Sequence, residues 1–198
     1  MKNLFILGSP RKNGNSETMA QAVASGVLQA PHNSVEYIHL NSLGIQPCQG
    51  CGGCNKTGKC IINDDMSKLY NKIDEAHRLF FVSPIYFYSV SAQLKAFVDR
   101  CQAQWARKYL LQTAQPKTTI RSGYLLSCAA TKGEKLFEGA ELIIKCLCDT
   151  LDVQYQTPLL IKNVEKIDAL KKQKDVLAAC VSFGTHLTQS QNHSTDKL

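Results

Sequence analysis

The sequence predicts an α/β fold in which helices cover both faces of a parallel sheet. Two observations lead to this prediction. Short apolar runs of strand length alternate along the chain with longer stretches whose apolar residues recur at helical spacing. Polar or glycine-containing loops separate these stretches. Strands that alternate with helices form β-α-β units, whose right-handed crossovers leave only a few possible topologies.

The first third of the chain shows this alternation in order. Residues 3–7 are apolar and end at a glycine, as expected of a buried strand. Residues 19–30 carry apolar side chains every three or four positions, which indicates an amphipathic helix. Residues 35–40 alternate as a strand does. Residues 44–63 show neither period, so we expect an insertion there, and Asp64 or Asp65 should cap the helix that follows.

The rest of the chain continues the pattern. We expect strands at 79–82, 120–127 and 153–161, and helices over 94–105, 137–151 and 165–187. Five strands fit the flavodoxin-like three-layer sandwich, with a parallel sheet of order 2-1-3-4-5 that binds its ligand at the carboxyl ends of the strands. We expect one domain over 1–187, with 44–63 as a Cys-rich insertion after the second strand, and a polar tail over 188–198.

The loop after the first strand is the first candidate binding segment. It reads GSPRKNGNSET over residues 8–18 and leads into the amphipathic helix. A helix N-terminus offers free N–H groups to a phosphate, and Arg11 adds a positive charge. Neither G-x-x-x-x-G-K-[ST] nor G-x-G-x-x-G is present. The alternative is a solvated loop in which Ser16 only caps the helix.

The segment after the third strand is the second candidate binding segment. It reads SPIYFYSV over residues 83–90, and its proline favours an extended or turning backbone. The aromatic side chains should lie at the carboxyl edge, where a planar ring system would find flat apolar neighbours. The alternative is that Tyr86 and Phe87 pack under the next helix.

These two segments make the chain resemble the NADPH-dependent FMN reductase family of flavodoxin-like proteins. The matching motifs are GSPR with GNS in the first segment, and SPIYF with QLKAFVDR in and after the second. The resemblance covers roughly the first 130 residues, while the rest matches only by pattern. It implies that FMN is the cofactor, held by its phosphate on the first segment and by its isoalloxazine ring on the second. The expected cofactor-binding residues are Ser9, Arg11, Asn13, Asn15, Ser16, Glu17, Thr18, Pro84, Ile85, Tyr86, Phe87 and Ser127. The loop over 127–133 would close the other side of the ring.

Four of the nine cysteines lie in the insertion. Cys48, Cys51, Cys54 and Cys60 have the spacing C-x2-C-x2-C-x5-C, which is typical of ferredoxin-like iron–sulfur ligands rather than of two separated zinc knuckles. This run resembles the iron–sulfur flavoproteins, a branch of the same fold, and the resemblance implies one [4Fe–4S] cluster beside FMN. Zinc, a loop of free thiols and a disulfide are the alternatives.

The remaining cysteines and the histidines suggest no further site. Five cysteines outside the insertion are expected to be small buried apolar residues: Cys101, Cys128, Cys146, Cys148 and Cys180. The five histidines are isolated, and we assign no catalytic acid or base. The formal charge is +7, but Lys and Arg are spread along the chain, which argues against nucleic-acid binding.

We therefore expect an FMN-dependent NAD(P)H oxidoreductase that passes electrons to a flavin, a quinone or an electron-transfer protein. The alternatives are an electron carrier fed by ferredoxin without a nicotinamide site, and a metal-stabilised interaction module without flavin. No apolar run approaches the roughly 20 residues that span a bilayer. Nothing resembles a signal peptide, so we expect a cytoplasmic protein without membrane partners. The apolar stripe that reaches Trp105 and Tyr109, together with the family resemblance, predicts a homodimer or higher homo-oligomer.

Overall fold

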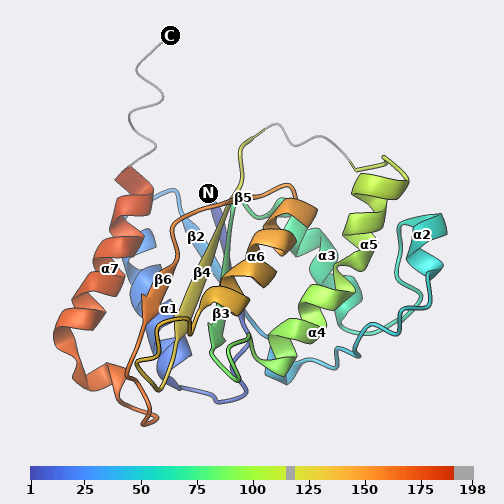
Figure 1. Cartoon of the computed structure of the whole chain (residues 1–198). Helices are drawn as coiled ribbons and strands as arrows, with labels where there is room; N and C mark the ends of the chain where they lie inside the picture. Colours follow the sequence, from blue (N-terminus) through green and yellow to red (C-terminus); the bar gives the residue numbers. More distant parts are fainter. Residues whose placement is uncertain (115–118, 190–198) are drawn as a thin grey trace.

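The computed structural model describes residues 1–114 and 119–189 of the chain. Its centre is a parallel sheet of order β2-β1-β3-β4-β5, and β6 also pairs with β4 (Figure 1). The strands are β1 (Lys2–Leu7), β2 (Ser34–His39), β3 (Arg78–Pro84), β4 (Ser122–Cys128), β5 (Gln154–Tyr155) and β6 (Leu159–Ile161). The predicted flavodoxin-like fold and its strand order are confirmed.

Side chains that alternate along the central strands build two separate cores. Leu4 and Ile6 of β1 belong to the core on one face of the sheet, and Phe5 and Leu7 belong to the core on the other. The neighbouring strands alternate in the same register, since Leu4 pairs with Leu79 and Phe5 with Phe80. Because both faces are buried, the strands read as continuous apolar runs rather than as an alternation.

Helices cover the two faces as the sequence predicts. On one face lie α1 (Asn15–Val27) and α7 (Lys174–Gln189), and on the other lie α3 (Met66–Glu75), α4 (Ala92–Arg100) and α6 (Glu138–Thr150) (Figure 1). The chain after α4 forms the short α5 (Gln102–Trp105) and then a π-helical turn over Ala106–Leu110. Leu40–Ser42 and Leu170–Lys172 are 3₁₀ turns. Within the described residues, no helix has the length and apolar character that a bilayer crossing requires.

The last part of the chain differs from the prediction in two places. The strand expected over 153–161 is split into β5 and β6, because Pro158 has no N–H to give to the ladder. The helix expected from Glu165 begins only at Lys174. The segment between them is instead held in an irregular loop by Asn15, as described below. Helix α7 continues to Gln189, and the rest of the predicted tail, 190–198, lies outside the described residues.

The insertion over 44–63 contains one short helix, α2 (Gly53–Thr57), at the side of the molecule away from α7 (Figure 1). Of the two candidate caps, the Asp64 carboxylate accepts the N–H of Met66 at 3.0 Å, whereas Asp65 accepts the N–H of Gly44. The five cysteines elsewhere are buried with one exception. Cys146 is exposed, because it lies off the buried stripe of α6.

Candidate functional site

A pocket of about 190 Å³ opens at the carboxyl edge of the sheet. Seven of the predicted binding residues line it: Ser9, Arg11, Asn15, Ser16, Pro84, Ile85 and Tyr86. They come from the loops after β1 and β3, which are neighbouring strands. The topology therefore brings the two candidate segments together, although about 70 residues separate them in the sequence.

The N-terminus of α1 faces this pocket without a capping side chain. Gly14 occupies the N-cap position, and none of the described side chains accepts a hydrogen bond there. The first backbone bond of the helix runs from the N–H of Thr18 to the carbonyl of Gly14, at 2.9 Å. The preceding N–H groups of the first turn are thus oriented toward the pocket end of α1, where an anion would be stabilised. The exposed Arg11 adds a cation at the same rim.

Asn15 shapes a wall of the pocket. Its side-chain amide donates to the carbonyls of Val164 and Lys166, at 3.2 and 2.8 Å, and its carbonyl accepts the N–H of Leu170 at 3.1 Å. Three bonds to one loop satisfy most of the capacity of the amide. The side chain of Asn15 is therefore engaged in holding this loop, which explains why the last helix starts late.

Ser16 and Cys128 form the floor of the pocket. Both are buried, and their Oγ and Sγ atoms lie 3.2 Å apart. Burial raises the pKa of the Cys128 thiol, and the hydrogen bond with Ser16 acts in the opposite direction. The thiol is therefore protonated at neutral pH and serves as a neutral hydrogen-bonding partner.

Tyr86, which lines the pocket on the β3 side, begins a strained aromatic turn. Tyr86 and Ser89 exchange two backbone hydrogen bonds of 3.0 Å, and Phe87 and Tyr88 between them have φ of 49° and 62°. The left-handed region costs an L-residue about 1–2 kcal/mol. Phe87 is fully exposed, so packing of its own side chain does not compensate for this cost. Such strain is typical of functional sites.

The other predicted residues lie outside the pocket lining. The N–H of Asn13 donates to the Glu17 carboxylate at 2.5 Å, which closes the loop before α1. Thr18 lies inside α1. Ser127 is fully buried and donates its hydroxyl to the carbonyl of Ser83 at 2.8 Å. Conversely, Val164, Glu165 and Ile167 line the pocket and were not predicted. Their only signal in the sequence is that they follow the last strand, at the same carboxyl edge.

The cysteine insertion has a cavity of its own, of about 140 Å³. All four of its cysteines line this cavity, and all nine cysteines of the chain are free thiols. Burial raises the pKa of Cys54, and the charges of Cys60, Cys48 and Cys51 raise it further. In the described part of the chain, no three His, Cys, Asp or Glu side chains are arranged to hold a metal ion. The thiols thus share a cavity without forming a closed metal site.

Arg100 joins the two ends of the insertion. Its buried guanidinium donates to the Asp64 carboxylate at 2.6 and 3.0 Å, to the carbonyl of Gln46 at 2.8 Å, and to that of Ile62 at 3.2 Å. The Nε atom of Arg100 is buried and has no hydrogen-bond partner within the described residues. Arg100 is also one of the residues that line the cavity. An anionic group in the cavity would satisfy this donor.

The fold and the position of the pocket define the class: a flavodoxin-like α/β protein with an open pocket at the carboxyl edge of its sheet. Comparison with known proteins identifies the family. A model of the NADPH-dependent FMN reductase family matches residues 1–122. The chain therefore belongs to this family, and the predicted resemblance is confirmed.

Sequence relatives agree with this assignment, and solved structures agree with the fold. An iron-sulfur flavoprotein of Archaeoglobus fulgidus is 42% identical over 100 residues, which are 50% of this chain and 45% of that protein. One of Methanocaldococcus jannaschii is 38% identical over 100 residues, which are 50% of this chain and 51% of the relative. The chain thus spans about half the length of these relatives. An NAD(P)H:quinone oxidoreductase from Methanothermobacter marburgensis has a similar fold, with a TM-score of 0.68 at 18% identity over 94% of this chain and 98% of that one.

Proposed function

We propose that the chain is an FMN-dependent oxidoreductase that takes electrons from NAD(P)H and passes them to an acceptor. The observation that carries this proposal is the carboxyl-edge pocket, whose lining combines an uncapped helix N-terminus with the segment Pro84 to Tyr86 that leads into the aromatic turn. Family membership independently supports FMN as the ligand and an oxidoreductase as the class.

The phosphate of FMN would bind at the first turn of α1. The unpaired N–H groups there and the positive end of the helix dipole suit a dianion. Arg11 supplies a charge-assisted hydrogen bond, and Ser9 supplies a hydroxyl, which now lies 3.2 Å from the N–H of Arg11. Asn15 acts indirectly through the loop that it holds, and Ser16 through the floor.

The isoalloxazine ring would lie against the segment from Pro84 to Phe87. Ile85 and Tyr86 offer apolar surface in the pocket, and the N–H of Ile85 is already bonded to the carbonyl of Cys128, which fixes the segment on the sheet. When bound, FMN supplies the chemistry of accepting hydride from NAD(P)H and releasing electrons to an acceptor. The chain's own residues bind and orient it, and we assign none of them as a proton donor or acceptor.

Titration of FMN into apoprotein tests the phosphate site. Arg11→Ala should weaken FMN binding by about 10- to 100-fold, because it removes a hydrogen bond to a charged group. The adjacent cation gives a matched control, since Lys12 does not line the pocket, and Lys12→Ala should leave the affinity nearly unchanged. Equal losses in the two variants would mean that only net charge matters and that the site is misplaced.

Rapid mixing of the FMN-loaded protein with NADPH or NADH tests the reaction. Fast bleaching of the flavin absorbance supports the enzyme. A flavin that neither nicotinamide reduces, but that reduced ferredoxin does, would establish the rival electron carrier. A protein that binds no flavin would leave only a metal-stabilised interaction module. The acceptor class, whether flavin, quinone or protein, is then found by reoxidising the reduced protein with one acceptor of each kind.

For the insertion, we propose a [4Fe–4S] cluster held by Cys48, Cys51, Cys54 and Cys60. The shared cavity, the unpartnered Nε of Arg100 and the names of the relatives support it. The Nε–H group of Arg100 suits the net negative charge of a thiolate-ligated cluster. In such clusters, N–H groups near the sulfurs adjust the reduction potential. Metal binding would also draw the four thiols together and order the glycine-rich loop.

Metal and sulfide analysis of anaerobically purified protein tests the cluster. Iron and labile sulfide near four per chain are expected. Cys54→Ala should lose both and keep FMN, whereas the exposed Cys146→Ala should lose neither. Zinc, or no metal, in the wild type would refute the cluster in favour of a zinc site or a thiol loop.

We also propose a homodimer or higher homo-oligomer. Phe87 and Tyr88 are exposed near the pocket, and the exposed Tyr109 lies against Trp105, with ring centroids 5.7 Å apart. Exposed aromatic side chains are favoured at protein interfaces. Light scattering at micromolar concentration should give at least twice the chain mass, and a monomer would contradict the proposal.

A further inference from the structure

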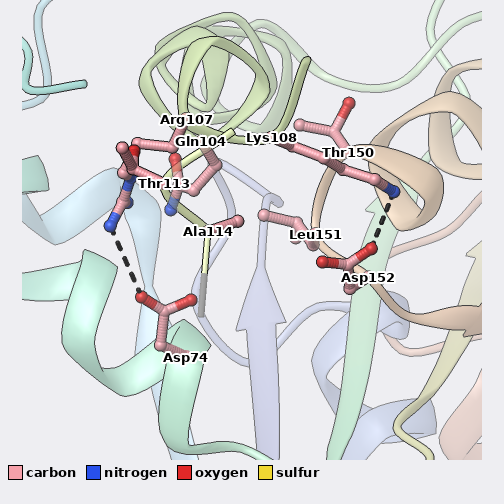
Figure 2. Close-up of a pocket in the computed structure, with 9 residues that line it drawn as sticks. All are labelled: Asp74, Gln104, Arg107, Lys108, Thr113, Ala114, Thr150, Leu151 and Asp152. Carbon is pink, nitrogen blue, oxygen red and sulfur yellow. Dashed lines mark ion pairs between the residues drawn. The ribbon is translucent and has the colours of Figure 1, made fainter. Parts of the chain in front are cut away.

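A second polar cavity lies at the edge of the sheet opposite the flavin pocket. Its volume is about 160 Å³, and its wall comes from the end of α3, from α5 and the π-helical turn, and from the end of α6 (Figure 2). These elements precede β3, β4 and β5, so the cavity lies at the amino ends of the strands. It shares no lining residue with the flavin pocket or with the cysteine cavity.

Gln104 is the unusual residue of this cavity. It is only 6% exposed, yet within the described chain neither its Oε1 nor its Nε2 has a hydrogen-bond partner. Arg107 Nε, from the same wall, is also buried and unpartnered. Nearby Arg121 is buried too, but its guanidinium has partners: it donates to the carbonyls of Ala76 and Leu151, each at 2.8 Å. Buried polar atoms without partners are rare and indicate a missing ligand or water.

The charges around the cavity are balanced. Arg107 pairs with Asp74 at 3.9 Å on one side, and Lys108 pairs with Asp152 at 2.7 Å on the other (Figure 2). Among the described lining residues each cation thus lies beside a carboxylate, so a charged ligand would meet a group of its own charge on either side. A neutral ligand is therefore favoured.

Local backbone structure holds these groups in place. Arg107 and Lys108 lie in the π-helical turn, a rare form that is frequent at functional sites. The stem of Arg107 packs on Gly58, where a Cβ atom would lie 2.6 Å from its Cγ. The stem of this side chain is thus fixed from outside the cavity, and its buried Nε has no partner within the described residues.

We propose that this cavity binds a small neutral carboxamide. A carboxamide presents an N–H donor beside a carbonyl acceptor, which is the complement of the Gln104 amide in a head-to-tail pair. The second lone pair of its carbonyl would accept from Arg107 Nε. Cavities of about 150 Å³ hold a benzene ring, so the occupant has about the size of one six-membered ring, and the three-ring flavin is too large.

The test uses the full chain with FMN bound and benzamide as the probe, with benzoate as the matched acid. Benzamide should raise the melting temperature and benzoate should not. Gln104→Met keeps the shape of the side chain and removes both hydrogen bonds, so the affinity for benzamide should fall by at least about 10-fold. Gln102→Met, on the same helix but facing the cysteine cavity, should bind as the wild type does.

The unliganded variant gives a second measurement. If the Gln104 amide is kept for a ligand, Gln104→Met should melt above the wild type, because it removes unsatisfied buried atoms. A lower melting temperature would mean that the amide is satisfied by bound water and is structural. That result overturns the proposal, as do the absence of benzamide binding to the wild type and equal binding to Gln104→Met.

Discussion

The carboxyl-edge pocket and the cysteine insertion are held together by different means. The pocket rests on two neighbouring strands, and its shape is set by backbone bonds, by the buried Ser16 and by the half-buried Asn15. The insertion has one short helix and no strand within the described residues, and three of its glycines have positive φ. Its two ends meet on a single guanidinium, that of Arg100.

The pocket is therefore a preformed site, whereas the insertion keeps its structure only while a few specific contacts are made. The pocket is part of the sheet edge and should persist without its ligand. The insertion has no apolar core of its own, and the buried ion pair of Arg100 with Asp64 is its main anchor; the proposed cluster would add to this. Damage to the insertion should therefore leave the flavin pocket intact, while damage to the sheet edge should affect the whole protein.

The largest expected effect comes from Arg100→Met. This substitution leaves the Asp64 carboxylate, whose side chain is 6% exposed, without its partner. Breaking a buried pair costs about 3–5 kcal/mol. Chemical denaturation should show a loss of that size, and residues 44–63 should become sensitive to protease. Lys95→Met breaks an exposed pair on the same helix and should cost only about 0.3–0.5 kcal/mol. Similar losses in the two variants would refute the role given to Arg100.

Gly8→Ala tests the pocket side of the comparison. A Cβ at Gly8 would lie 2.7 Å from Leu94 Cβ and 2.9 Å from Ser91 Oγ, so the loop after β1 would have to move. Overpacking of this kind costs about 1–3 kcal/mol, and FMN affinity should fall with it. Gly44→Ala, in the insertion, adds a Cβ 3.7 Å from Asp65, and denaturation should show it to be close to neutral. A neutral Gly8→Ala would mean that the pocket loop is adaptable.

The fold was largely predictable because the apolar periods are strong where both faces of the sheet are buried. The order of the strands and the meeting of two distant loops followed from topology alone. The prediction was wrong where one residue overrides a pattern. Pro158 interrupts the last strand, and the long-range bonds of Asn15 remove the first turns of the expected last helix.

The candidate sites were predictable only where a motif marks them. Cys48 to Cys60 and the loop over 8–18 carry recognisable spacing, whereas the wall from Val164 to Ile167 carries none. Gln104 gave no signal, since a glutamine in a helix is ordinary and only its three-dimensional surroundings show that it lacks partners. The π-helical turn is likewise a backbone feature without a sequence signature.

Lowering the pH should destabilise the cysteine insertion before it destabilises the carboxyl-edge pocket. Burial acts to raise the pKa of Asp64, but hydrogen bonds from Arg100 and from the N–H groups of Gln46 and Met66 outweigh it, so the pKa lies below its ordinary value. The stabilisation is complete above the unfolded pKa of about 3.9 and is lost as the pH falls through the folded value. Hydrogen exchange at pH 5 and pH 3 should show the insertion opening before the loop over 8–16. In Asp64→Asn the protection factors of the insertion should depend less on pH in this range, and the Asp65 carboxylate, which accepts the N–H of Gly44, accounts for the dependence that stays.

The smallest effect concerns the strain stored in the aromatic turn. Phe87→Gly removes a left-handed aromatic residue whose side chain is fully exposed, so the free energy of unfolding should rise by about 0.5–1 kcal/mol. Gln112 is a matched control, since it is exposed with φ of 52° and lies outside the lining of the flavin pocket. Gln112→Gly should give the same gain and leave FMN binding unchanged. Only Phe87→Gly should also weaken FMN binding, by several-fold, because strain kept at a binding site is compensated by contact with the ligand. If the two variants bind FMN equally well, then Phe87 does not contact the flavin, and its conformation serves another contact, such as that between subunits.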